Sequence, residues 1–338
     1  MEISGRKANV SLKSLAEMLG VSRTTVSWVL SGQGDEKSIS PAMQQKIKAL
    51  AAKYNYQPNF LARSLNLRHT NTIGLVVSSL ADPFYSSIAK AVVTRAEESG
   101  YSVVMATSES SNEREEKLVE MLRHRQVDGI ILTPSQKPKG YLKKMADDGY
   151  NIVMLDRNIP ELESTYVVAD NKESSYTLVD NLIAKGCRRI AIFTTAHDLG
   201  NMQFRYNGYR EALENAGLEA SPELFFNVLN AADQAEVAGH IGRLIKAAPD
   251  VDGIFFTTHV LVLPVFIALL EKGYEVNGGA NWACIHSQPE FSLLLPNMNV
   301  AQLPTEELGA RSVDVLLKSL NHEPFDSRNV LNCELRLH

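Results

Sequence analysis

The first sixty residues carry apolar side chains at helical spacing and show no strand pattern. In 11–20, apolar residues recur every three or four positions between a serine and a glycine, the usual start and stop signals of a helix. The same signals predict a second helix over 22–30. A third is expected over 40–54, where an N-cap serine precedes a proline in the first turn.

From residue 72 onward the pattern changes to short β-branched runs that alternate with amphipathic helices. The candidate strands are 73–77, 102–106, 129–132, 152–155, 189–193, 253–257 and 282–285. Several helical stretches end at a glycine that directly precedes a tyrosine, namely Gly100, Gly149 and Gly273. Strand–helix alternation predicts parallel sheets covered on both faces, and the number of elements favours two lobes. Ligands of such sheets bind beyond the carboxyl ends of the strands, so we expect a cleft between the lobes to hold the ligand.

Charge is distributed unevenly along the chain. The 338 residues carry a net charge of −5, yet residues 1–69 hold ten Lys/Arg against four Asp/Glu, a balance of +6 that leaves −11 for the remainder. A basic head on an acidic body is typical of nucleic-acid binding by the head alone, although a solvated helical surface gives the same balance.

Composition limits the class of protein further. The 44% apolar and 22% charged content is that of an ordinary globular chain. No apolar run approaches the roughly 18 residues of a membrane span, and the polar N-terminus lacks the apolar segment of a signal peptide. Three distant cysteines, Cys187, Cys284 and Cys333, favour neither a disulfide framework nor a zinc site. These features predict a cytoplasmic protein without a membrane partner.

The two helices expected before residue 30 form a helix-turn-helix pattern, with a glycine in the turn. The outer face of the second helix carries Arg23, Thr24, Ser27 and Trp28, which suit base edges in a major groove. The alternative is a small helical bundle whose polar face only keeps it in solution. Trp28 favours the DNA interpretation, because a tryptophan exposed on a polar face is costly without a partner.

The head and the linker that follows it resemble the lactose-repressor/galactose-repressor family. The matching segments are Leu15-Ala16, Gly20-Val21-Ser22, Thr25-Val26-Ser27 and the linker 54–65, which runs directly into 72–77 as the family's first sensor strand does. The resemblance covers nearly the whole chain. It implies a sequence-specific transcriptional regulator, expected to be a repressor, that binds a palindromic double-stranded DNA operator as a homodimer.

The resemblance also implies the domain organisation. A helix-turn-helix head is expected at 1–57, a hinge helix or linker at 58–70, and an effector-binding and dimerisation domain at 71–338. The implied fold class is an all-α head followed by a periplasmic-binding-protein-like α/β sensor with two doubly wound parallel sheets. Lobe 1 is expected to comprise about 71–170 and 297–325, and lobe 2 about 171–296 and 326–338.

The linker has a role of its own in this comparison. A segment of about seven residues is too short to be a stable helix alone, and the resemblance implies that it folds when two copies meet on DNA. Leu65 is then the apolar wedge in the minor groove, and Ala62 allows close approach. The alternative is a plain linker in which Leu65 is ordinary packing. The expected DNA-contacting residues are Ser11, Ser22, Arg23, Thr24, Thr25, Ser27, Trp28, Asn59, Ala62 and Leu65. The connection 32–39 is about three residues longer than the family's common form, and we expect it to loop out without harm.

The expected effector residues follow strand ends in the sensor domain. They are Asp82, Phe84, Tyr85, Arg157, Asp170, Arg205, His259 and His286, and Phe84, Tyr85 and the helix after them are also candidate dimer contacts. Two features of the family are absent, because Thr258-His259 stands in place of an Asn-Asp pair and His286-Ser287-Gln288 in place of a Gly-Phe-Asp run. Loss of carboxylates and gain of histidines lead to the hypothesis that the sugar-like effector is a sugar phosphate or sugar acid, held by Arg205 and His259, with Arg157 as a further candidate. Ordinary hydrogen-bonded histidines are the equal alternative.

Two other classes of protein fit less well. A periplasmic sugar-binding protein shares the two-lobed architecture but needs a signal peptide and lacks a basic helical head. An enzyme needs a catalytic constellation, and the sequence has no phosphate loop, nucleophile elbow or paired metal ligands of the recognised spacings. We therefore expect no catalytic residues, no metal and no cofactor.

Overall fold

The computed structural model describes residues 10–56, 69–135, 140–159, 162–195 and 200–338. By internal contacts the chain divides into two units, Met1–Thr70 and Asn71–His338. The first unit contains the helices α1 (Leu12–Leu19), α2 (Arg23–Leu30) and α3 (Pro41–Lys53). Their apolar faces meet in a small core of Leu15, Ala16, Val26, Val29, Ile47 and Ala51.

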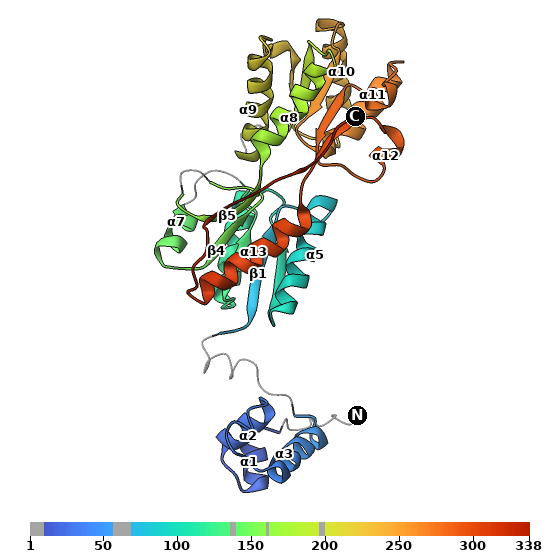
Figure 1. The fold of residues 1–338 in the computed structure, drawn as a ribbon. Coiled ribbons are helices and arrows are strands. Elements are labelled where there is room, and N and C mark those ends of the chain that lie inside the picture. Colours follow the sequence, from blue (N-terminus) through green and yellow to red (C-terminus); the bar gives the residue numbers. More distant parts are fainter. Residues whose placement is uncertain (1–9, 57–68, 136–139, 160–161, 196–199) are drawn as a thin grey trace. The chain divides into compact units, whose positions relative to one another are not determined.

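The second unit contains two six-stranded sheets, which define two lobes (Figure 1). The sheet of lobe 1 has the order β11-β5-β4-β3-β1-β2 and that of lobe 2 the order β12-β10-β9-β8-β6-β7. The pairings are parallel except that of β10 with β12, which is antiparallel. The strands are β1 (Thr72–Val77), β2 (Ser102–Thr107), β3 (Gly129–Leu132), β4 (Ile152–Leu155), β5 (Thr165–Ala169), β6 (Ile190–Thr194), β7 (Phe225–Asn227), β8 (Gly253–Phe256), β9 (Trp282–Ile285), β10 (Asn299–Gln302), β11 (Arg328–Leu331) and β12 (Glu334–Arg336).

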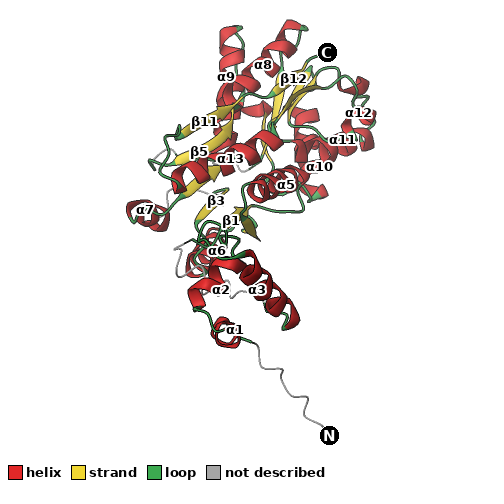
Figure 2. Ribbon diagram, turned by 60° about the horizontal axis from the view of Figure 1, so that its bottom comes forward, coloured by secondary structure: helices red, strands yellow, loops and turns green. Residues whose placement is uncertain are grey.

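Helices cover both faces of each sheet, as Figure 2 shows. In β1, Leu75 and Val77 pack toward α5 and α13, whereas Val76 packs toward α6 and α7, which is the period-two alternation of a strand. The helices of this unit are α5 (Pro83–Glu98), α6 (Asn112–His124), α7 (Gly140–Asp147), α8 (Asn171–Ala184), α9 (Gly200–Asn215), α10 (Gln234–Ala247), α11 (Val262–Glu271), α12 (Phe291–Leu294) and α13 (Thr305–Leu320), with short 3₁₀ turns at Pro222–Leu224, His259–Leu261 and Asn277–Gly279. The expected fold class is confirmed.

The two lobes repeat one topology. Residues 127–130 and 251–254 both read Val-Asp-Gly-Ile, and each copy leads into the central strand, β3 in lobe 1 and β8 in lobe 2. The fourth strands also correspond, because the carbonyl of Asn151 before β4 and that of Asn281 before β9 both accept a hydrogen bond from the isoleucine of this motif. Positions in lobe 1 can therefore be compared directly with positions in lobe 2.

The expected lobe boundaries are wrong near the C-terminus. β10, expected in lobe 1, pairs with β9 of lobe 2, and β11, expected in lobe 2, pairs with β5 of lobe 1. The chain thus passes between the lobes three times, after β5, after β10 and after β11. The sequence did not indicate this arrangement, since the last crossing joins two short strands separated by only two residues.

Glycines permit close contact of the helix pairs in each lobe. A Cβ atom on Gly208 of α9 would lie 2.2 Å from the carbonyl oxygen of Lys172 in α8. In lobe 1, a Cβ atom on Gly309 of α13 would lie 2.7 Å from the Cβ of Ala91 in α5. The helices of the pairs α8–α9 and α5–α13 lie side by side in Figure 1. Their close approach requires glycine at these two positions, because a side chain would collide with the partner helix.

Candidate functional site

The head presents a capped second helix with a polar outer face. Ser22 accepts a hydrogen bond from the backbone N–H of Thr25 at 3.0 Å, which fixes the start of α2. Arg23, Thr24 and Ser27 are exposed, whereas Thr25 is partly buried and its hydroxyl lies 2.8 Å from that of Ser22. Three of the expected base-contacting side chains are thus free to reach a DNA groove.

Ser11 has the same capping role at the first helix. Its hydroxyl accepts from the backbone N–H of Ser14 at 3.1 Å. The turn between the helices relies on Gly20, whose φ of 64° is the left-handed conformation expected of a glycine stop signal. Asn59, Ala62 and Leu65, the expected linker contacts, lie outside the described residues.

Trp28 differs from its expected environment. The side chain is half-buried, and the ammonium group of Lys37 lies 5.5 Å from the centre of its ring. Trp28 therefore has a cation–π partner inside the head, which removes the argument that an exposed tryptophan needs DNA to cover it. Its place among the DNA-contacting residues loses that support.

The long connection after α2 is also more ordered than a loose insertion. The Gln44 side chain donates to Asp35 Oδ1 and to the carbonyl oxygen of Ile39, both at 2.8 Å. A Cβ atom on Gly34 would lie 2.5 Å from that glutamine. The extra residues therefore form a folded turn fastened to α3, and this turn carries Lys37 to the face of Trp28.

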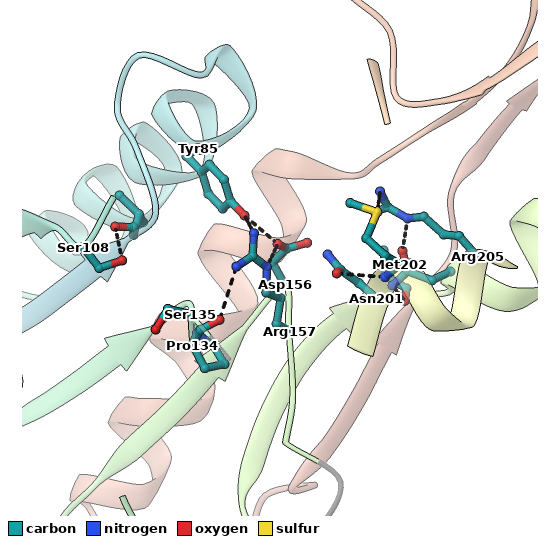
Figure 3. Close-up of polar contacts among 12 residues, drawn as sticks. Tyr85, Ser108, Pro134, Ser135, Asp156, Arg157, Asn201, Met202 and Arg205 are labelled. Carbon is teal, nitrogen blue, oxygen red and sulfur yellow. Dashed lines mark hydrogen bonds and ion pairs between the residues drawn. The ribbon is translucent and has the colours of Figure 1, made fainter. Parts of the chain in front are cut away.

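Polar side chains of lobe 1 gather where β1 and β4 end (Figure 3). The Tyr85 hydroxyl donates to Asp156 Oδ2 at 3.0 Å and accepts from Arg157 Nη2 at 2.9 Å. Arg157 also donates to the carbonyl oxygen of Pro134 at 3.3 Å, and its Nε lies 3.7 Å from Asp156 Oδ2. Burial raises the pKa of Tyr85, so its hydroxyl keeps its proton. In this cluster the guanidinium of Arg157 is neutralised by a carboxylate.

Lobe 2 contributes a second cationic side chain, Arg205 of α9. It is 3% exposed, and it donates to Asn171 Oδ1 through Nε and to the carbonyl oxygen of Thr257 through Nη1, both at 2.7 Å. Burial lowers the pKa of Arg205, although a guanidinium remains charged in proteins. Its hydrogen-bond partners are neutral.

Two pairs of predicted effector residues contact one another across the lobes. His259 Nε2 of lobe 2 lies 3.2 Å from Asp82 Oδ1 of lobe 1. The Phe84 ring of lobe 1 meets the His286 ring of lobe 2 edge to face, with centres 5.3 Å apart. The rings of His259 and His286 are themselves 5.0 Å apart. The structure thus brings four of the predicted effector residues together at one interlobe contact.

The contact with Gln302 assigns a tautomer to His286. Its Nδ1 lies 3.0 Å from the side-chain nitrogen of Gln302. With the amide in this orientation that nitrogen donates, so Nδ1 accepts and Nε2 carries the proton. Burial, the neighbouring His259 and Arg205 lower the pKa of His286 to about 3. The ring is therefore a neutral hydrogen-bond donor at physiological pH.

Two expectations are not supported by this geometry. Asp170 caps α8, accepting from the backbone N–H of Glu173 at 3.2 Å, and no described contact joins it to the interlobe cluster. Phe84 and Tyr85 are only 5% and 6% exposed, so they cannot offer a dimer surface, contrary to the expectation. The aromatic ring of Tyr85 is enclosed by its own lobe rather than open to stack on a sugar.

Sequence reasoning placed Asp156 and Asn171 after strand ends but did not predict which side chains they contact, and it did not single out Gln302. Asp156 directly precedes the predicted Arg157, but its contact with Tyr85 depends on how two strands end side by side. Asn171 and Gln302, which hold Arg205 and His286, are ordinary amides in the sequence. Asn171 begins α8, two residues after the end of β5, and Gln302 is the last residue of β10.

A cavity of about 330 Å³ lies elsewhere in lobe 2, between α10 and α11 at the amino-terminal ends of β8 and β9. Its lining includes Leu244, Tyr274, Asn277 and Trp282 and none of the predicted effector residues. Among the described residues, no helix is both long and apolar enough to cross a membrane, and no cluster of three metal-ligating side chains occurs.

A helix-turn-helix head followed by a two-lobed domain of this topology defines a ligand-responsive transcriptional regulator. Two family models match the chain: bacterial regulatory proteins of the lacI family over residues 11–59, and periplasmic binding proteins and sugar binding domain of LacI family over residues 70–334. The chain belongs to the lacI family of bacterial regulatory proteins.

Individual relatives agree with this assignment along nearly the whole chain. The ribose operon repressor of Halalkalibacterium halodurans is 29% identical over 94% of this chain and 92% of its own length. The regulator CelR of Thermobifida fusca is 30% identical over 94% of both chains. Among solved structures, a CelR–cellobiose complex is 28% identical with a TM-score of 0.70, covering 97% of this chain and 98% of that one. A lac repressor dimer bound to operator has a TM-score of 0.84 at 22% identity, over 96% and 97% of the two chains, which shows the shared fold.

Proposed function

We propose that this regulator binds a palindromic operator as a homodimer, represses transcription there, and changes its operator affinity when a sugar-like molecule binds between the lobes. The observation that carries the proposal is one chain in which a capped helix with exposed Arg23, Thr24 and Ser27 precedes a domain of two lobes that meet at the Asp82–His259 contact. Such a regulator works where chromosomal DNA lies, so the proposal includes a cytoplasmic location.

The DNA-contacting part of the proposal assigns different roles to different residues. Ser11 and Ser22 cap the two helices and position their first turns near phosphates. The exposed side chains of α2 read base edges in the major groove. The linker residues Asn59, Ala62 and Leu65 contact the minor groove in the proposal, on the strength of the sequence resemblance alone.

The effector is proposed to bind at the interlobe contact, beside Asp82, His259 and His286. An effector that prefers one arrangement of the lobes shifts the equilibrium by its differential affinity for the two arrangements. The Asp82–His259 pair joins the lobes directly, so a change in the arrangement of the lobes would alter this contact.

Selection of bound fragments from a random DNA pool tests the proposal. We expect the full-length protein to enrich a two-fold symmetric sequence, with half-sites spaced by about one helical turn, and to bind it far more tightly than random competitor at moderate salt. The triple substitution Arg23→Ala, Thr24→Ala, Ser27→Ala should remove the enrichment. If the protein shows no sequence preference, with or without sugars, the proposal is wrong.

A further inference from the structure

The residue after the fourth strand occupies the same conformation in both lobes. Asp156 follows β4 with a φ of 65°, and His286 follows β9 with a φ of 68°. Each donates its backbone N–H to the neighbouring strand, Asp156 to the carbonyl of Val167 at 2.9 Å and His286 to that of Ala301 at 2.8 Å. A side chain held in this costly backbone region at the carboxyl edge of a sheet is typical of a ligand site. The two lobes thus contribute equivalent positions with different chemistry.

The charges around these two positions differ. In lobe 1, Asp156 and Arg157 neutralise one another, and the Tyr85 hydroxyl bonds to both. Across the lobes, the carboxylate of Asp82 already pairs with His259. Arg205 is different, because within the described part of the chain no carboxylate oxygen lies within 4.0 Å of its guanidinium. The carboxylate of Asp156 acts on Arg205 only from beyond this distance.

A buried guanidinium that no carboxylate contacts is unfavourable in general, even when neutral groups accept its hydrogen bonds. An anion that binds beside it removes this cost and gains charge-assisted hydrogen bonds. The position that corresponds to Asp156 supplies a neutral donor, the Nε2–H of His286, where lobe 1 has a carboxylate. This side of the contact therefore favours a ligand group that only accepts hydrogen bonds.

We propose that the effector is a polyhydroxylated acid whose carboxylate or phosphate binds at Arg205 and His286 of lobe 2, while its hydroxyl groups face Asp156 of lobe 1. The inference deepens the proposed function and rests on it, since it concerns the same site. His259 and Arg157 already have their carboxylate partners, Asp82 and Asp156, which leaves Arg205 as the counter-charge for the acid.

Thermal unfolding of the full-length protein with inorganic phosphate, at constant ionic strength set with chloride, tests the anion site directly. We expect a saturable rise in Tm for the wild type. His286→Asp places a carboxylate beside Arg205 and should reduce the apparent phosphate affinity at least tenfold, whereas His286→Asn, which keeps a neutral side chain at the same positive φ, should reduce it far less. Arg125→Gln removes an exposed cation and should leave the affinity unchanged.

Calorimetry with matched compounds then tests the orientation: glucose, gluconate and glucose 6-phosphate, and ribose, ribonate and ribose 5-phosphate. We expect an acid or phosphate to bind at least tenfold more tightly than its neutral parent, and His286→Asp to reverse that preference.

Equal binding of a neutral sugar and its acid, the absence of saturable stabilisation by phosphate, or an anion effect that His286→Asp does not alter each overturn the inference. None of these results bears on DNA selection, which judges the proposed function separately.

Discussion

The imidazole of His259 and the carboxylate of Asp82 join the two lobes across 3.2 Å. Burial raises the pKa of Asp82, but the hydrogen bond and positive charge of His259 outweigh it and hold that pKa below its usual value. Asp82 also caps α5, accepting from the N–H of Phe84 at 2.9 Å. One carboxylate therefore fixes a helix start and an interlobe contact.

Asp82→Asn should separate these two roles, because asparagine keeps the cap and loses the charge. We expect a loss of roughly 1 kcal/mol in unfolding free energy at a pH where the Asp82 carboxylate is ionised and pairs with His259. The loss should vanish as the pH falls through the pKa of Asp82, since the protonated carboxyl no longer pairs with His259. Thermal unfolding measures both effects. Asp170→Asn, at a cap residue without a described ion pair, is the control and should be nearly neutral.

His286 should make the free energy of unfolding depend on pH between its pKa in the folded protein and its pKa in the unfolded chain. Its pKa is about 3 in the folded protein against 6.5 ordinarily, so the unfolded chain alone takes up a proton between these values. Stability is therefore complete above pH 6.5 and falls below it, by on the order of 2 kcal/mol between pH 7 and pH 5. His286→Asn should remove this part of the pH dependence. His322→Asn is the control, because His322 is exposed and has a similar φ of 57°; an equal effect of both variants contradicts the prediction.

Gly208→Ala should destabilise the α8–α9 pair. The added methyl group meets the Lys172 carbonyl oxygen, which cannot move without separating the helices. We expect a cost of about 1–3 kcal/mol, visible as a lower Tm. Gly239→Ala in α10 meets no atom within 4 Å and should raise stability by roughly 0.5–1 kcal/mol. A neutral Gly208→Ala variant would mean that the helices have room to adjust.

Helix α11 carries an exposed apolar stripe that a second copy of the chain should cover. Leu263, Ile267 and Leu270 are 37%, 42% and 48% exposed and lie on one helical face. Ile267→Asp should weaken the homodimer at least tenfold in sedimentation velocity. Leu229→Asp, at an 80% exposed loop residue, is the matched control. A dimer unaffected by Ile267→Asp excludes this helix from the interface.

Leu65→Ala tests whether the linker inserts an apolar side chain into the minor groove. If Leu65 is the minor-groove wedge, specific operator affinity should fall by roughly ten-fold or more, while the salt dependence of binding stays the same because no phosphate contact is lost. Titration of a selected operator at several salt concentrations gives both quantities. Unchanged affinity would favour the plain-linker alternative.

The sequence predicted seven of the described strands within a residue at each end, among them the edge strand β2. β1, β3, β4, β8 and β9 are buried apolar runs, and their predicted and observed bounds agree within a residue. β5, β7, β10, β11 and β12 were not among the predicted strands. Of these, β11 and β12 have largely exposed side chains, and β7 has only three residues, so they carry little apolar pattern to detect. Without these strands, the sequence could not predict where the chain passes from one lobe to the other.

For the candidate site, the sequence indicated which residues follow strand ends but not how they pair. Parallel sheets bring such residues to one edge, so Asp82, Phe84, His259 and His286 could be expected near one another. The pairing of Arg205 with neutral groups, and of Trp28 with Lys37, depends on side-chain directions that local sequence does not determine. The same holds for the positive φ of Asp156 and His286.

The three passages of the chain between the lobes restrict how an effector can act. Because three backbone segments join the lobes, after β5, β10 and β11, the lobes cannot move independently as two domains on one flexible linker would. Bending all three segments together permits a twist or a swing about a shared axis, and little else. Cleavage of the peptide at any one of them would still leave two covalent joints, so a nicked regulator should keep its bilobed form while losing the stiffness that transmits the effector's signal.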